Sequence, residues 1–322
     1  MLIDSKPNHG SSNTLMSQQA LACFDRLANL ASKTCTSNIE RLSIKLMKQC
    51  RKIQYINYIT PDLGKSRPQL ARFIFYKEFP KISELESVVV QIALISKLAK
   101  NAPNLVAKEN LPDNILKYYP GAFDRLALRL EKVANSPKQT RYNLFDLLGF
   151  VLATDIPCGA QLLDVKSTVP LQSVLLNIHR ERSIKNLTNY IRCKGLGTWF
   201  RGHTDVEYLD EFNEEGWDRF YLSIAELLLR RKEVRGLVGT SWFYDPQLIN
   251  ISPRLAYLQL RQIERGAFLM RHRGLDSDIN FATKTSPTRR SLYQEGKYNP
   301  ISYSLVWERN KIISWANRLL KK

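Results

Sequence analysis

Three consecutive stretches decide the fold: GTWFRGHTD (residues 197–205), EFNEEGWDRFYLSIAELLLRRKE (211–233) and GLVGTSWFYDP (236–246). The first and third are short and rich in aromatic and β-branched residues, which is typical of strands. The middle stretch carries apolar residues at the three-to-four-residue spacing of an amphipathic helix. A strand, a helix and a second strand in succession indicate an α/β unit.

The same alternation continues toward the C-terminus. ISYSLVW (301–307) has the pattern of a strand, SPTRRSLYQEG (286–296) opens a helix, and a last helix passes through Trp315. INFATKTS (279–286) is interpreted as a strand, and ISPRLAYLQL (251–260) fits either a strand or the start of a helix. We therefore predict an α/β (α+β) C-terminal domain over residues 196–322, with a mixed sheet flanked by helices.

The chain before this domain has a helical pattern. Apolar residues recur every three or four positions over residues 17–32 and 36–53, and further helical stretches are predicted at about 68–79, 82–100, 120–134 and 140–153. These stretches predict a mainly helical N-terminal domain over residues 13–165, preceded by a disordered tail at 1–12. A single bridging helix is expected over 166–195, with Pro170 in its first turn and Gly195 at its end.

The amino-acid composition indicates which kinds of partner the protein binds and in which cellular compartment it occurs. The chain of 322 residues is 44% hydrophobic and carries a formal charge of +18. A positive surface favours nucleic acid, anionic lipid or an acidic small molecule, although a charge spread over both halves also serves general solubility. The five cysteines form no CxxC pair and the N-terminus resembles no secretory signal, so a reducing, cytoplasmic compartment is predicted. The most apolar run, residues 88–95, is too short to span a membrane.

Two Ser-Pro pairs suggest helix starts, at Ser252-Pro253-Arg254 and at Ser286-Pro287 before Arg289 and Arg290. Capping accounts for serine and proline. It does not account for arginine, because the helix dipole disfavours a cation in the first turn. An anion held by backbone N–H groups and a guanidinium would account for it, so Arg254, Ser286, Arg289 and Arg290 are candidate binding residues for a phosphate or carboxylate.

A second polar cluster follows the first strand, in RGHTDVEYLDEFNEEGW (residues 201–217). His203 and Asp205 have the spacing of two metal ligands, but no third ligand pairs with them, so no metal site is predicted. His203 is also a candidate general base at a strand end, and both residues could simply stabilise a loop. Glu215 has two interpretations: its negative charge stabilises the N-terminus of the following helix, or it acts as a base. The chain contains no P-loop, GxGxxG, GxSxG or HExxH pattern.

The segment SPTRRSLYQEGKYNPISYSLVW (286–307) resembles the closing section of the GNAT superfamily of acyltransferases, through Leu292-Tyr293, Gly296 and Tyr298, with INFATKTS as the preceding strand. The resemblance covers residues from about 198 to 310. It implies transfer of an acyl group from a coenzyme A thioester to an amine, with acyl-CoA as co-substrate and its phosphates near helix N-termini. It also implies that Tyr293 protonates the departing thiolate, while His203, Asp205 or Glu215 takes the amine proton.

Two other functions fit the same residues. One is a basic protein that binds nucleic acid or regulates a partner without catalysis, which requires Lys and Arg to form a continuous stripe. The other is a different α/β enzyme that uses a metal through His203 and Asp205. All the enzyme hypotheses require His203, Asp205, Asp245, Arg289 and Tyr293 to converge on one pocket.

Overall fold

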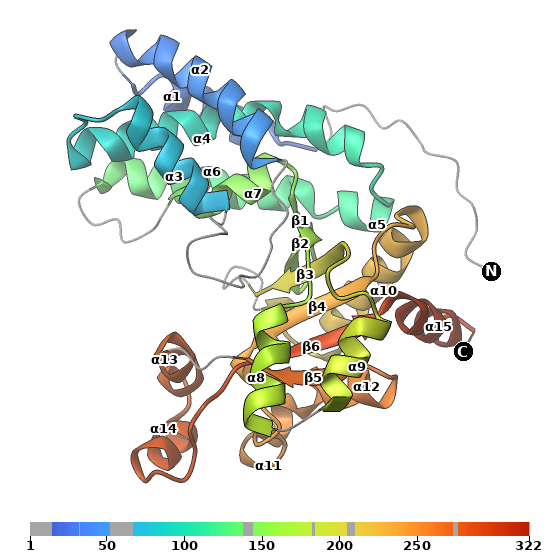
Figure 1. The fold of residues 1–322 in the computed structure, drawn as a ribbon. Helices are drawn as coiled ribbons and strands as arrows, with labels where there is room; N and C mark the ends of the chain where they lie inside the picture. The colour runs from blue at the N-terminus through green and yellow to red at the C-terminus, as the bar shows by residue number, and fades with distance from the viewer. Residues whose placement is uncertain are drawn as a thin grey trace. The chain divides into compact units, whose positions relative to one another are not determined.

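The structure is a computed structural model that describes residues 15–31, 33–51, 67–137, 144–181, 184–204, 210–272 and 276–321 (Figure 1). Of these described residues, those up to Asp164 form one compact unit, and those from Val165 onward form a second. The predicted disordered tail, residues 1–12, lies outside the described residues. None of the helices that the structure describes is long and apolar enough to cross a bilayer. The cytoplasmic location stays a prediction.

The first unit is mainly helical, which confirms that part of the predicted fold class. Its longest helix, α4, packs against α1, α2 and α6, and is opened by a capping box between Ser83 and Glu86. The apolar spacing that predicted these helices also fills the core, where Phe24 of α1 meets Phe123 of α6. The helices are α1 (Gln18–Ala28), α2 (Lys33–Cys50), α3 (Arg67–Glu78), α4 (Glu84–Val106), η2 (Ala107–Glu109), α5 (Asp113–Leu116), α6 (Tyr119–Asn135), η4 (Leu144–Leu147) and α7 (Leu148–Val151).

A hairpin that was not predicted follows, made of β1 (Asp155–Cys158) and β2 (Gln161–Ser167). Its two-residue turn contains Gly159 at a φ of +69°, which only glycine adopts readily. Most residues of both strands are buried. They therefore lack the apolar and polar alternation by which a half-exposed strand is recognised.

The second unit alternates strands and helices, which confirms the predicted mixed sheet with flanking helices (Figure 1). Within this unit the strand order is β3-β4-β6-β5, and the end of β2 lies beside β3. Strands β3 and β4 are parallel, whereas β6 runs antiparallel to both β4 and β5. The elements are α8 (Leu171–Glu181), α9 (Ile184–Arg192), β3 (Trp199–His203), α10 (Glu214–Arg230), β4 (Gly236–Ser241), η6 (Trp242–Tyr244), α11 (Leu248–Ile251), η7 (Pro253–Leu258), α12 (Leu260–Glu264), β5 (Phe268–Arg271), α13 (Asp276–Lys284), α14 (Pro287–Gln294), β6 (Tyr303–Glu308) and α15 (Arg309–Leu319).

Helices cover both faces of this sheet. On one face α8 and α9 lie side by side and enclose an apolar cluster with the strands (Figure 1). On the other face α10 packs against α15, and the ring of Trp307 from β6 contacts both Tyr221 and Trp315. The buried members of the first cluster are Val169, Val174, Tyr190, Cys193, Trp199, Val238, Met270 and Val306.

Three local predictions were wrong. The bridging helix predicted over 166–195 is wrong at its start, because Lys166 and Ser167 belong to β2, and the described residues after them contain the helices α8 and α9. INFATKTS belongs mostly to α13, where buried Asp278 and Ala282 are one helical turn apart. ISPRLAYLQL is not a strand, since it forms the 3-10 helix η7 and the start of α12.

Candidate active site

The parallel pair of strands places the candidate site. Strands β3 and β4 pair from Phe200 with Leu237 to Gly202 with Gly239, and α10 connects them. Because the two strands run in the same direction, their carboxyl ends, His203 and Ser241, lie at the same edge of the sheet. Ligands of open α/β sheets bind outside the carboxyl ends of the strands. Residues around this edge are therefore the first candidates for a functional role.

A buried arginine organises the polar groups near this edge. Arg201 on β3 is only 5% exposed. Its Nε donates to Ser167 Oγ at 2.9 Å, its Nη1 to Thr240 Oγ1 at 3.2 Å and its Nη2 to the Thr168 carbonyl at 3.1 Å. Thr240 in turn lies 2.9 Å from Ser304 Oγ. We call Arg201, Ser167, Thr168, Thr240 and Ser304 the arginine row, which joins β2, β3, β4 and β6.

On the face of the sheet that carries the arginine row, the side chains of β3 change from apolar to charged and polar along the strand. Trp199 belongs to the apolar cluster under α8 and α9, and Arg201 is the next residue on the same face. His203, one further step along that face, is partly exposed at the end of the strand. A cation and an imidazole are thus placed in succession, from the buried interior to the edge.

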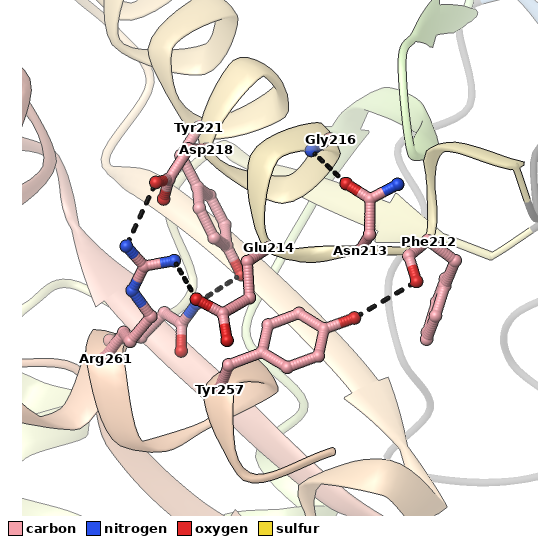
Figure 2. A network of polar contacts seen from close by, with 9 residues as sticks. Phe212, Asn213, Glu214, Gly216, Asp218, Tyr221, Tyr257 and Arg261 are labelled. Carbon is pink, nitrogen blue, oxygen red and sulfur yellow. Dashed lines mark hydrogen bonds and ion pairs between the residues drawn. The ribbon is translucent and has the colours of Figure 1, made fainter. Parts of the chain in front are cut away.

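The start of α10 is fixed beside this edge by a network of polar contacts (Figure 2). Asn213 caps the helix by accepting from the Gly216 N–H at 2.9 Å. Arg261 of α12 binds Asp218 at 3.1 Å and Glu214 at 3.3 Å. The contacts of Arg261 hold the first turns of α10 against α12.

The same network uses a tyrosine of η7. The Tyr257 hydroxyl donates to the Phe212 carbonyl at 3.2 Å (Figure 2). Burial, together with the nearby charge of Glu214, raises the pKa of Tyr257 to about 12. The phenol therefore stays protonated, as the donor role requires, throughout the physiological range.

A second buried polar cluster follows the end of β4. The Asp245 carboxylate is fully buried and accepts from the backbone N–H groups of Gln247 and Ile301, at 3.0 and 3.3 Å. Burial raises the pKa of Asp245, partly offset by these hydrogen bonds. Burial, and then the charge of Asp245, also raise the pKa of Tyr298, whose hydroxyl has no hydrogen-bond partner among the described residues.

We expect the stability difference between the wild type and Asp245→Asn to depend on pH. An acid whose pKa is raised on folding contributes most below its unfolded pKa, near 4, and loses that contribution as the pH rises through the folded value. The difference should therefore move in favour of the wild type as the pH falls from 7 toward 4. Urea unfolding of both proteins at several pH values measures it, and a flat or opposite dependence would show that Asp245 titrates normally.

Arg289 lies in this same cluster, not on the surface. It is 2% exposed, its Nη1 donates to Ser252 Oγ at 3.0 Å, and its Cζ lies 4.8 Å from the centre of the Trp242 ring. Its Nε donates to the Ala282 carbonyl near the end of α13. Burial, with a further contribution from the charge of Arg254, lowers the pKa of Arg289.

Helix termini account for both arginines of the second Ser-Pro motif. Ser286 caps α14 by accepting from the Arg289 N–H at 3.3 Å. Arg290 is exposed and donates to the carbonyls of Thr283 and Lys284, at 3.4 and 2.8 Å. The last carbonyls of a helix lack partners within the helix, and the two guanidinium groups supply partners at the end of α13.

The structure brings some of the predicted site residues together and leaves others apart. Asp245 and Arg289 belong to the cluster that follows β4, and His203 stands at the end of β3. Tyr293 lies on α14 and is 38% exposed, whereas the Glu215 side chain in the first turn of α10 is 89% exposed. Asp205 lies outside the described residues.

Arg254 is an exposed residue of η7, a segment that contacts η6 after β4. Among the described residues, no group of three His, Cys, Asp or Glu side chains is arranged to hold a metal ion.

The arginine row itself was not predicted. Its signal in the sequence is a charged residue inside an otherwise aromatic strand, in TWFRG (198–202). A buried charge needs partners. Those partners come from strands that the sequence pattern does not connect to β3, so the row emerges only from the fold.

Comparisons with known proteins gave no family. No protein-family model matches the chain, and no curated protein matches it. Among solved structures, the chain is similar to an acyltransferase in complex with decanoyl-CoA and teicoplanin, with a TM-score of 0.49 and 11% identity over 91% of this chain and 88% of that one. It is also similar to an acyltransferase in complex with decanoyl-CoA, with a TM-score of 0.44 and 12% identity over the same shares. TM-scores below 0.5 give no residue correspondence to this chain.

Proposed function

We propose that the protein is an acyltransferase that uses an acyl-CoA thioester as donor and acts at the carboxyl ends of β3 and β4. The observation that carries the proposal is the arginine row, with His203 beyond it on the same face of β3. The buried guanidinium of Arg201 places a positive charge near this edge, which favours an anionic donor and the negative charge that develops on a thioester oxygen. The fold supports this location, because ligands of α/β sheets collect at this edge.

We propose an amine as the acceptor. The amine nitrogen attacks the thioester carbon, the new C–N bond forms, the C–S bond breaks, and coenzyme A leaves as a thiolate. His203 is the proposed general base for the amine proton, because an imidazole titrates near neutral pH. Glu215 and Asp205 are the alternative bases, and the resemblance to GNAT enzymes gives Tyr293 the role of protonating the thiolate.

Arg254 is the proposed contact for the phosphates of the donor. It is exposed on η7, which packs against both α10 and the segment after β4, near the proposed site. Arg289 is a poorer candidate, because its guanidinium is buried against Trp242 and donates to protein oxygens. Arg290 is exposed but caps α13, so binding a phosphate would cost those hydrogen bonds.

A ligand that binds only the folded protein stabilises it, by about 2.7 kcal/mol at a hundredfold excess over its dissociation constant. We expect acetyl-CoA or decanoyl-CoA to raise the thermal midpoint of the full chain by a few degrees. Arg254→Ala should remove most of this shift, while Lys232→Ala, which deletes an exposed cation at the end of α10, should retain it.

A measurement of enzymatic turnover distinguishes a loss of catalysis from a loss of acyl-CoA binding. Release of free thiol from the thioester, measured with a primary amine as acceptor, should fall in His203→Gln and in Tyr293→Phe while the thermal shift persists. A midpoint that rises with single-stranded DNA alone, and loses the rise at high salt, would contradict the proposal and assign the protein to the nucleic-acid binders.

A further inference from the structure

Helix α9 has two apolar faces, and among the described residues only one of them packs inside the protein. Tyr190 and Cys193 are buried at 5% and 6% exposure and join the apolar cluster against the sheet, with Leu187 packed against it. These three residues are spaced by three and account for the inner face. They also explain why the helix forms, since they anchor it to β3 and β4 through Trp199 and Val238.

The other apolar face points to solvent. Ile184 is 72% exposed and Ile191 is 66% exposed. Seven residues turn an α-helix to within about 20° of its starting direction, so the two isoleucines share one face. Leu196, in the turn that follows, is 65% exposed. Large aliphatic side chains that are exposed together on one face, rather than singly, are typical of a surface that contacts something apolar.

The chain segment that forms this face contributes charge of a single sign. Residues 184–197 contain Lys185, Arg192 and Lys194 and no aspartate or glutamate. Lys185 and Lys194 are exposed, and Arg192 keeps 60% of its side chain exposed while its Nη2 lies 3.6 Å from Glu308. The surface formed by Ile184, Ile191, Leu196 and these three cations is called the α9 face below.

We infer that the α9 face docks on an anionic lipid surface. Aliphatic side chains beside lysine and arginine are the combination by which an amphipathic helix lies in the membrane interface, with the apolar groups among the acyl chains and the cations at the headgroups. A nucleic acid fits less well, because isoleucine and leucine offer no ring on which a base can stack, and Tyr190 of α9 is buried. The inference is independent of the proposed acyltransferase activity.

Vesicle sedimentation with the full chain tests this inference. We expect the protein to sediment with vesicles of phosphatidylcholine and phosphatidylglycerol in equal parts at low salt, and much less with phosphatidylcholine alone. Replacing both Ile184 and Ile191 with serine should weaken partitioning on the order of tenfold, because two buried aliphatic groups are lost from the interface. Lys185→Gln combined with Lys194→Gln should weaken it by a similar factor.

The matched control replaces Leu85 and Leu128 with serine. These residues are 43% and 66% exposed on α4 and α6, outside the α9 face, and their loss should leave partitioning unchanged. An unchanged thermal midpoint of the isoleucine variant verifies its fold. The inference fails if the wild type does not bind the anionic vesicles or if the isoleucine variant binds as tightly as the wild type. It also fails if that variant changes the size-exclusion volume, which would make the α9 face a contact between copies.

Discussion

Replacing Gly236 with alanine should lower the free energy of unfolding by about 3 kcal/mol or more. Gly236 opens β4 at a φ of +154° and pairs with Glu308 of β6. A Cβ atom there would lie 2.2 Å from the Trp307 carbonyl oxygen and 2.7 Å from Cζ3 of Trp199. The first is a backbone atom of the neighbouring strand and the second belongs to a fully buried ring, so neither can move away cheaply.

Gly296→Ala is the matched control for Gly236→Ala. Gly296 also has a positive φ, at +69°, but no neighbouring atom of the described residues lies within 4 Å of the position that a Cβ would occupy. Its substitution should cost only the backbone strain, about 1 kcal/mol. Urea unfolding followed by circular dichroism measures both variants. Equal losses would show that the close approach of β4 to Trp307 does not limit the residue at position 236.

Arg289→Ala should destabilise the protein by about 3 kcal/mol. The substitution removes a buried guanidinium that stacks on Trp242 and donates to the Ala282 carbonyl and to Ser252 Oγ. Those oxygens would remain buried without their donor, which is costlier than the loss of an exposed hydrogen bond. The α13–α14 segment should therefore lose much of its attachment to η6.

Arg290→Ala is the matched control for Arg289→Ala, because it removes the same charge from the neighbouring position. Arg290 is exposed and its contacts to Thr283 and Lys284 are open to water, so its loss should stay within about 1 kcal/mol. Thermal and urea unfolding distinguish the two variants. If Arg289→Ala left stability unchanged but abolished binding of acyl-CoA, the side chain would serve an anion and the structural role assigned to it would be wrong.

The β3–α10–β4 unit could be predicted because its signals are local. Each strand is short and aromatic, and the helix between them has a clear apolar period, so neighbouring residues alone determine the pattern. The β1–β2 hairpin was missed because its strands are mostly buried and do not alternate. INFATKTS was misassigned because eight residues with mixed propensities fit a strand as well as a helix, and the packing of Asp278 and Ala282 decides between them.

The candidate site could be predicted only in part, for the same reason. The position of His203 at the end of a strand is a local signal and could be predicted, whereas its catalytic role stays a prediction. Arg201 is bound to Ser167 and Thr240, 34 and 39 positions away in the sequence, so its role depends on which strands become neighbours. Arg289 was interpreted as an anion contact because its real partners, Trp242 and Ser252, are also distant in sequence.

The five tryptophans, all beyond residue 198, make the second unit optically distinct from the first. Trp199, Trp217, Trp307 and Trp315 are each at most 3% exposed. Their fluorescence therefore reports the packing of the α/β unit alone, whereas the far-ultraviolet signal is dominated by helices from both units. Tryptophan fluorescence and far-ultraviolet circular dichroism, recorded on the same unlabelled sample, therefore show whether the two units unfold together or one after the other.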